Sequence, residues 1–542
     1  MAPSAINVNS SPSTDVESSA AYTASSVKPD ILEKPISPGD GSDHSASIEG
    51  AVLEKGTLDP VYEAKALVLN HAIQEIGMGW YQWQLFTVVG FGWANDNLWP
   101  IVTSLILPLI IDEFHPSRPP YLLLAQSVGL LFGAIFWGFG CDVFGRRWAF
   151  NLTLGVTAFF GLIAASANSF AAISCFVALW SFGVGGNLPV DSAVFLEFLP
   201  GSHQYLLTLL STLWALAQLL ATAVAWPMLA NFSCQESQKI CNREHNMGWR
   251  YFVITMGGIS FALFLVRFLA FTVYESPKYL MGKGRDEEAV KVVLEVARRN
   301  GKVSNLTIHD LSACEDQIGA TQNTNTSAAL RREFEKLNFT HIRALFATRK
   351  LGLSTGLIMA IWAFIGLAYP LYSSFLPYIQ ALKGAEFGDG DTSTIYRNSC
   401  IIAAAGLPGV ALGTKLIQIP KFGRRGALAL FTCLTGAFLY CTTTAVTSNS
   451  LLGWNCAFNF CSNIMYAVLY GYTPEIFPTK DRGTGNALTA TSNRVFGTMA
   501  PIIAMVANLE TPVPVYTSGA LFIIAGLLVF ILPFESQGKA SL

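Results

Sequence analysis

The chain has 542 residues, of which 52% are hydrophobic and only 13% are charged. Soluble domains carry about 25% charged residues, so this composition excludes an ordinary soluble protein. Apolar segments recur between about residues 84 and 534, and about 20 residues suffice to span a bilayer. The sequence therefore indicates a polytopic membrane protein, and its formal net charge of −2 argues against a nucleic-acid partner.

The N-terminal part of the chain has two sections of different composition. Residues 1–60 are rich in Ser, Pro, Asp and Glu without an apolar period, which predicts a disordered cytoplasmic tail. In residues 61–83, Ala66, Leu69 and Ile73 recur near helical spacing, which predicts an amphipathic helix at the membrane interface. Neither end has the pattern of a cleaved signal peptide, so we expect the first membrane helix to act as the targeting signal.

The rest of the chain predicts an all-α membrane protein with twelve transmembrane helices in two pseudo-symmetric six-helix halves. We expect an N-terminal bundle over 84–273 and a C-terminal bundle over 350–534. Residues 274–349 between them are more polar and predict a cytoplasmic linker with short helices. One of these, over 286–299, has an apolar face and a charged face. Residues 535–542 form a C-terminal tail.

The two halves share landmarks at a fixed distance. The sequence Phe-Gly-Arg-Arg occurs at 144–147 and again at 422–425, and Glu197 has its counterpart in Glu475. Each landmark lies 278 positions after its first copy, so the pattern indicates a repeated half. Two parallel membrane halves around a central pathway are typical of secondary transporters.

Basic residues lie mostly on one side of the predicted spans. Arg146, Arg147, Arg424 and Arg425 belong to this side, and the opposite loops hold fewer Lys and Arg residues. The positive-inside rule then predicts that both termini face the cytoplasm. We expect the protein in the plasma membrane, with a vacuolar or other internal membrane as the alternative.

The loop around 231–249 would face the outside or a lumen. Asn231 begins a glycosylation sequon there, and Cys234 and Cys241 share the same polar loop. An oxidising compartment would allow a disulfide between them, with two free thiols as the alternative. The spacing of His and Cys residues suggests no metal site, and we expect no cofactor.

Charged residues inside membrane spans are costly and mark transport pathways. Asp96 lies near the middle of the first span and is predicted to couple protons or substrate; a structural acid hydrogen-bonded by Asn95 and Asn97 is the alternative. Asp191 lies at a depth comparable to that of Arg267, so it either joins the coupling or forms a structural ion pair.

Arg494 lies ten residues into the eleventh predicted span and, being permanently charged, requires a partner. It could hold an anionic substrate or neutralise a carboxylate of the opposite half. Among the aromatic residues of the spans, Trp93, Tyr369 and Tyr372 are the candidates to line a cavity and stack on a ring; the others are better explained as interfacial anchors.

A second charged set lies at the cytoplasmic ends of the spans and follows the repeat. A salt-bridge cluster in such a place can favour one of two conformations, so we predict a network that opens and closes with the inner gate. Ordinary solvated helix ends are the alternative. The predicted members are Asp142, Gly145, Arg146, Arg147, Glu197, Arg424, Arg425, Glu475 and Arg482.

These motifs resemble those of a known family. Gly138-x-x-x-Asp142-x-x-Gly145-Arg146-Arg147 is similar to the loop signature between helices two and three of the major facilitator superfamily. The segments 182–191 and 472–478 resemble the branch that contains synaptic vesicle glycoprotein 2 relatives and sugar porters. The chain departs from the pattern at Val143, Val177 and Pro420, where relatives carry a charged residue.

The resemblance implies twelve helices and secondary transport by alternating access. We expect a small organic solute, either an organic or aromatic acid or a sugar-like compound, to be carried with protons by a monomer in the lipid bilayer. A non-transporting sensor or vesicle-membrane protein on the same scaffold is the alternative. The sequence shows no nucleophile–base set and no GxxxxGK[ST] loop, so we do not expect an enzyme.

Overall fold

The structure is a computed structural model. It describes residues 60–203, 205–234, 241–318, 343, 345–388, 391–416, 423–477, 482–507 and 511–533. The predicted tails, 1–60 and 535–542, lie outside these residues except for Pro60, as does much of the linker. The side chains of Asp142 and Arg482 also lie outside the described part.

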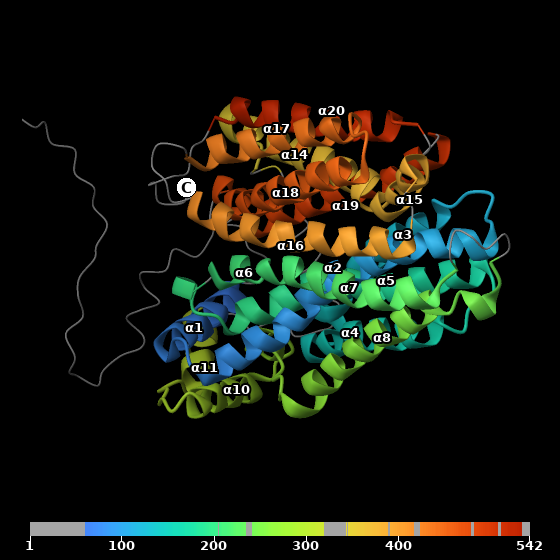
Figure 1. The fold of residues 1–542 in the computed structure, drawn as a ribbon. Coiled ribbons are helices and arrows are strands. Elements are labelled where there is room, and N and C mark those ends of the chain that lie inside the picture. The colour runs from blue at the N-terminus through green and yellow to red at the C-terminus, as the bar shows by residue number, and fades with distance from the viewer. Residues whose placement is uncertain are drawn as a thin grey trace, which may run out of the picture.

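Twelve long helices make up the described membrane part, and no strand occurs in these residues. The first six are α2 (Trp80–Phe114), α3 (Tyr121–Phe144), α4 (Arg146–Ala164), α5 (Phe170–Phe198), α7 (Thr212–Phe232) and α8 (Gly248–Leu265). The second six are α14 (Arg349–Ser373), α16 (Thr392–Leu416), α17 (Gly423–Thr442), α18 (Ser448–Ile476), α19 (Arg482–Val506) and α20 (Val513–Ile531). Figure 1 shows the two sets as two layers of roughly parallel helices, which confirms the predicted all-α fold with two halves.

Ten of the described helices are long and apolar enough to cross a membrane by themselves. The other two long helices, α18 and α19, carry more polar side chains, among them the buried Asn455 and Asn459 and the charged Arg494. Both helices are nevertheless built into the bundle, because α18 packs against α16 and α17 while α19 packs against α14. Their polar residues are tolerated because they face protein rather than lipid.

Three predicted spans are interrupted. The fifth span begins with a separate short helix, α6 (Tyr205–Leu209), before α7. In the seventh, α14 ends at Ser373 and a new helix, α15 (Leu376–Phe387), carries Pro377 in its first turn. Proline lacks an N–H group and therefore suits a helix start better than a helix interior. The sixth ends in a π-helix over Val266–Ala270.

Four shorter helices form a cluster at one end of the N-terminal half. They are α1 (Pro60–Ile76), α9 (Pro277–Gly282), α10 (Asp286–Arg299) and α11 (Ile308–Ile318). The bounds of α10 confirm the predicted amphipathic helix, whose face with Val293 and Val296 is buried. Figure 1 shows α1, α10 and α11 together at this end, which we call the linker end. The opposite end, with the loop that holds Cys234, we call the disulfide end.

The helix α1 packs against the linker helices, and its place at the membrane interface stays a prediction. Lys65 in α1 is 1% exposed, and its Nζ lies 2.5 Å from Asp286 Oδ2 in α10 and 2.7 Å from Glu315 Oε1 in α11. The start of α2 is held in the same way, because the Asn300 side chain accepts a hydrogen bond from the Tyr81 N–H at 3.0 Å. These bonds dock α1 onto the linker helices, an arrangement that depends on contacts more than 200 residues apart.

The two halves are joined most closely at the disulfide end. One hydrophobic cluster there contains residues of both halves, such as Leu105 with Phe375 and Tyr396. The Tyr396 hydroxyl donates to the Leu105 carbonyl at 2.9 Å, and the Ser104 hydroxyl donates to the Ser374 carbonyl at 2.6 Å. The cluster at the linker end holds only residues of the N-terminal half, α1 and the linker, and a third cluster holds only residues from 345 onward.

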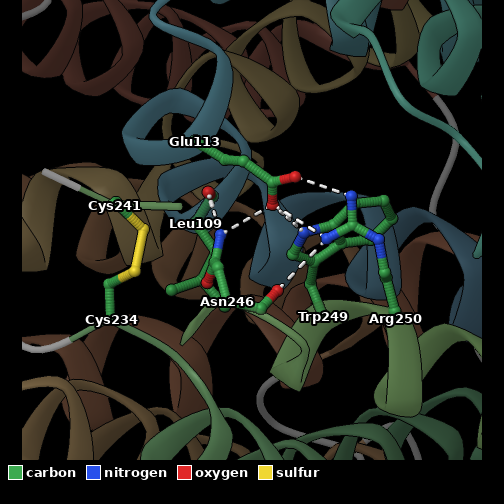
Figure 2. The surroundings of a disulfide bond; sticks show 7 residues. All are labelled: Leu109, Glu113, Cys234, Cys241, Asn246, Trp249 and Arg250. Atoms are coloured by element: carbon green, nitrogen blue, oxygen red, sulfur yellow. Dashed lines mark hydrogen bonds and ion pairs between the residues drawn. A yellow bond between two sulfur atoms is a disulfide. The ribbon is translucent and has the colours of Figure 1, made fainter. Parts of the chain in front are cut away.

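A buried ion pair lies next to the disulfide between Cys234 and Cys241 (Figure 2). The Arg250 Nη2 lies 2.6 Å from Glu113 Oε1, and both side chains are at most 5% exposed. Glu113 also accepts hydrogen bonds from the Trp249 indole at 2.8 Å and from the Asn246 amide at 3.0 Å. This cluster ties α2 to the start of α8, and the sequence analysis did not anticipate it.

Replacing Glu113 with Gln should destabilise the protein strongly. Removing one partner of a buried ion pair leaves an uncompensated buried charge on Arg250, and such losses amount to ~3–5 kcal/mol of unfolding free energy. Thermal unfolding in detergent should show a clearly lowered midpoint. Glu244→Gln is the matched control, because Glu244 lies in the loop that follows Cys241 and is exposed. Equal midpoints for both variants would contradict the structural role of the pair.

The docking of α1 should depend on pH only under alkaline conditions. Burial lowers the pKa of Lys65, but the hydrogen bonds and charges of Asp286 and Glu315 outweigh this effect and raise the pKa above its usual value of 10.5. A raised pKa means that the Lys65 contribution is fully present below the unfolded-state pKa and is lost as pH rises through the folded-state pKa.

Hydrogen exchange of the α1 amides measures this prediction. We expect protection that is constant from neutral pH to about pH 10, lost above it, and absent at any pH in Lys65→Leu after correction for intrinsic exchange rates. Lys291→Leu, which removes an exposed linker lysine, is the control. Protection that persists in Lys65→Leu would show that this lysine does not hold the helix.

Candidate functional site

A charge pair joins the two halves near the middle of the bundle. Asp96 belongs to α2 and Arg494 to α19, and Arg494 Nη2 lies 3.7 Å from Asp96 Oδ1. The two side chains are only 17% and 20% exposed. Of the two partners left open for Arg494, the structure places a carboxylate of the opposite half beside it. At this distance the two groups form an ion pair without a short hydrogen bond, so Arg494 can exchange Asp96 for another anion.

The neighbouring amides do not hold Asp96. Asn95 accepts hydrogen bonds from the Ser260 hydroxyl at 2.7 Å and from the Trp99 indole at 3.1 Å. Asn97 donates to the Trp214 carbonyl at 2.9 Å. Both amides therefore fasten α2 to other helices, and the reading of Asp96 as an acid satisfied by its neighbours gains no support from these contacts.

Four aromatic rings run from one half to the other beside this pair. Trp93 in α2 stacks on Trp214 in α7 with centroids 5.4 Å apart. Trp214 meets the edge of Tyr470 in α18 at 4.8 Å, and Tyr470 meets Trp362 in α14 at 4.8 Å. Trp93 lies one turn before Asp96 on the same face of α2, and the Asn97 amide binds the Trp214 carbonyl, so the rings lie beside the pair. We call Trp93, Trp214, Tyr470 and Trp362 the aromatic bridge.

The bridge offers hydrogen-bond donors as well as ring faces. The indole N–H groups of Trp93 and Trp214 are buried without a hydrogen-bond partner in the described part of the chain. The indole of Trp362, in contrast, donates to the Thr473 hydroxyl at 2.9 Å. Buried donors without a partner are rare in proteins and suggest a missing ligand or water. The bridge is therefore suited to a ring that carries acceptor atoms.

The other two predicted cavity aromatics, Tyr369 and Tyr372, have different surroundings. Tyr369 lies in α14 against Tyr466, with ring centroids 5.3 Å apart, and is partly buried. Tyr372 is 1% exposed, and its hydroxyl donates to Asn455 at 2.7 Å within the core of the C-terminal half. Its prediction as a cavity residue is therefore corrected to a packing role. Tyr369 and Tyr372 are three residues apart and therefore lie on nearby faces of α14. Only the packing of α14 against its neighbours decides which face meets the pathway.

Sequence reasoning missed three of the four bridge residues. Trp214, Trp362 and Tyr470 come from three different spans, and single aromatic residues in apolar segments are common in lipid-facing positions as well. One usable signal was present for Trp362, which lies near the middle of α14, whereas Trp214 lies in the first turn of α7. The meeting of the three is decided by helix packing alone.

Asp191 and Arg267 form the ion pair that was one of the two readings of these residues. Asp191 lies in α5 and Arg267 in the π-helix that ends the sixth span, and both are fully buried. The guanidinium of Arg267 also covers the ring of Phe150 in α4, 3.2 Å from its centroid. Asp191 packs against Gly92 of α2, one turn before Asp96.

At the linker end four of the predicted gate residues form two equivalent ion pairs, and their role in a gate stays a prediction. Arg146 forms an ion pair with Glu197, and Arg424 forms one with Glu475. Each pair stays within its own half and follows the 278-residue repeat. Each one ties the start of one helix, α4 or α17, to the end of another, α5 or α18.

Other predicted gate residues make hydrogen bonds in which one of the two partners is a backbone group. Glu275 accepts hydrogen bonds from the backbone N–H groups of Arg146 at 2.8 Å and Arg147 at 3.3 Å, as expected for a carboxylate at a helix start. Gly145, which precedes them, has a φ of 107° that favours glycine. Arg425 donates to the Leu532 carbonyl at 2.8 Å. The side chains of Asp142 and Arg482 lie outside the described part.

These features define an integral multi-pass membrane protein of the transporter class, with two six-helix halves around a central charge pair. The chain belongs to the Major Facilitator Superfamily, whose sequence model matches residues 85–421. It is therefore a transporter of the major facilitator type.

Individual relatives cover nearly the whole chain. The MFS siderochrome iron transporter 1 of Ceriporiopsis subvermispora is 52% identical over 91% of this chain and 94% of its own length. The niacin transporter NiaP of Acinetobacter baylyi is 25% identical over 86% of this chain and 97% of its own. The xylose transporter XylE from E. coli, in a partially occluded inward-open conformation, shares the fold with a TM-score of 0.59 at 18% identity. It covers 85% of this chain and 99% of its own.

Breaking one linker-end pair should slow transport without removing substrate binding. Glu475→Gln should lower the rate of substrate exchange in proteoliposomes roughly fivefold, because a partly exposed ion pair contributes up to about 1 kcal/mol. Glu287→Gln, which removes an exposed pair with Lys291, is the control. An unchanged exchange rate in Glu475→Gln and in Arg424→Ala would reduce these residues to surface charge.

Proposed function

We propose that the protein is a secondary active transporter that carries a small aromatic acid together with protons. The observation that carries this proposal is the pair of Asp96 and Arg494, which belong to opposite halves and lie beside the aromatic bridge. One side chain supplies a cation for a carboxylate, and the other supplies a proton-binding group. The bridge supplies ring faces and two indole donors.

The substrate class follows from the chemistry of these groups. Arg494 matches the planar geometry of a carboxylate, because a guanidinium can donate two parallel hydrogen bonds. A ring attached to this carboxylate would stack on Trp93 or Trp214, whose free N–H groups suit an acceptor atom in the ring. The names of the relatives point to different cargoes, a siderochrome and niacin. The substrate class therefore rests on the site, and niacin is an example of such an acid.

Proton coupling follows from competition for Arg494. When the carboxylate of a substrate binds Arg494, Asp96 loses its cationic neighbour in a poorly solvated place. A carboxylate that loses such a partner gains affinity for a proton. Binding of the acid would therefore be accompanied by protonation of Asp96, and both would be released together on the other side.

Alternating access would use the two ends in turn. The shared hydrophobic cluster closes the disulfide end, while the Arg146–Glu197 and Arg424–Glu475 pairs leave each half separately braced at the linker end. This arrangement supports a conformation that gives access to the site from the linker end. Movement of one half against the other would reverse it.

The charge distribution supports an orientation in the membrane. The linker end carries the basic pairs, and the disulfide end carries Cys234 and Cys241, which suit an oxidising space. We place both termini in the cytoplasm and the protein in the plasma membrane as a monomer. Asn231, which is exposed at the end of α7, stays a predicted glycosylation site.

A thermal-shift screen tests the substrate class. Nicotinate and benzoate should stabilise the purified protein, and xylose should not. A ligand at about 100 times its Kd adds ~2.7 kcal/mol of stability. The stabilisation should disappear in Arg494→Ala and persist in Arg397→Ala, an exposed arginine of the same half. Stabilisation by a sugar that does not depend on Arg494 would overturn the proposal, and no response to any class would favour the sensor reading.

Asp96→Asn separates coupling from binding. The amide cannot exchange a proton, so accumulation of nicotinate driven by an imposed pH gradient should be lost in proteoliposomes. Exchange of internal for external nicotinate needs no net proton movement and should persist. Asn97→Ser, which removes the adjacent amide's side-chain bond, is the control for local disturbance. Normal accumulation by Asp96→Asn would exclude this carboxylate as the coupling site.

A further inference from the structure

A second polar cluster, which contains the Asp191–Arg267 pair, lies beside the coupling site. Asn187, Asp191 and Arg267 are each fully buried. Both amide atoms of Asn187, the Oδ2 of Asp191, and the Nε and Nη1 of Arg267 have no hydrogen-bond partner among the described residues. Such a concentration of unsatisfied buried groups is unusual, because buried polar atoms nearly always bind protein or ordered water. The cluster therefore offers buried donors and acceptors to which water can bind.

The backbone brings this cluster against the helix that carries Asp96. Asn187 and Asp191 are four residues apart in α5 and so lie on one face. That face meets Gly92 of α2, where an added Cβ would clash with Asp191 and lie 3.5 Å from the Asn187 Cβ. Gly92 is one turn before Asp96 on the same face of α2. Because Gly92 has no side chain, α2 and α5 can pack closely enough to bring Asp96 and Asp191 near each other.

We infer that Asn187, Asp191 and Arg267 form a hydrated relay that carries the coupling proton between Asp96 and the linker end. This inference rests on the proposed function, because it extends the path of the same proton. In the relay step the O–H bond of the Asp96 carboxyl group breaks and a water molecule takes the proton. A proton passes on to the Asp191 carboxylate, so that Asp96 becomes charged and Asp191 neutral.

Arg267 acts as a positioning residue in this step. It stays cationic and binds Asp191 Oδ1, which leaves Oδ2 as the oxygen that is open to a proton. The stack on Phe150 fixes the guanidinium plane, and the π-helix around Arg267 turns its side chain into the cluster. π-helical turns are frequent at functional sites.

The surroundings give the relay a direction. The helices α2, α3 and α4 pack against α5. Their charged residues near the cluster are Asp96 on one side and the Arg146–Glu197 pair on the other, and residues 121–141 of α3 contain no charged residue. The Asp112 and Glu113 carboxylates lie at the disulfide end. Asp191, which packs against Gly92, lies about one helical turn nearer the linker end than Asp96, and the apolar cluster and the Arg146–Glu197 pair lie beyond it.

The water molecules can be tested without knowing the substrate. A cryo-electron microscopy map of the wild-type protein, at a resolution that shows ordered water, should contain water bound to Asn187 and to Asp191 Oδ2. The same map of Asn187→Leu should lack it, because leucine fills the place of the amide without offering a donor or acceptor. A dry cluster in the wild-type protein, with its polar atoms bound to one another, would overturn the relay.

Transport by Asn187→Leu tests the path of the proton. Accumulation of nicotinate driven by a pH gradient should fall roughly 100-fold, the lower end of what positioned proton-transfer groups contribute, while nicotinate exchange persists. Gln126→Leu, which replaces a buried amide near the disulfide end that also has an unsatisfied oxygen, is the matched control. Asp191→Asn combined with Arg267→Leu should behave like Asn187→Leu and avoids an unpaired buried charge.

The outcomes separate the two proposals. Loss of coupling in Asp96→Asn together with normal coupling in Asn187→Leu and in the double variant would overturn the relay and leave the proposed function intact. Absence of nicotinate transport in the wild-type protein would count against the proposed substrate, whereas the water map would still decide whether the cluster is hydrated.

Discussion

The structure depends on one costly arrangement, which is a pair of opposite charges held inside a membrane bundle. Two unit charges about 4 Å apart attract each other by roughly 4 kcal/mol at an effective dielectric constant of about 20, whereas an isolated charge in this place would be strongly unfavourable. Asp96 and Arg494 therefore stabilise the contact of the two halves only while each has the other or a substitute. A bound carboxylate or a proton is such a substitute, so a ligand can change the contact between the halves.

The rest of the molecule makes this contact adjustable. The halves share an apolar cluster at the disulfide end but are braced separately at the linker end, by Arg146–Glu197 and by Arg424–Glu475. Within the N-terminal half, Asp191 and Arg267 form a second buried pair next to the first. In the proposed relay, the proton passes between the Asp96–Arg494 pair and the Asp191–Arg267 pair, whose cluster contains polar atoms without a partner. A single isolated pair would only hold two helices together.

Much of the fold could be predicted from the sequence because membrane spans have a strong local signal. Segments of about 20 apolar residues must form helices, since lipid cannot satisfy backbone polar groups. The breaks were harder to predict. Pro377 starts the new helix α15, and Lys65 docks α1 on the linker helices. Both outcomes depend on neighbours that are distant in the chain.

The sequence by itself determined the twelve spans, the repeated halves, the charged residues inside the membrane and the equivalent positions of the linker-end pairs. These follow from composition and spacing, which are local properties. Only the tertiary structure decided that Arg494 meets Asp96, that Tyr372 is packed away, and that Trp214, Tyr470 and Trp362 continue the line begun by Trp93. A helix presents side chains all around its axis, and the packing of helices far apart in sequence selects the face that meets the pathway.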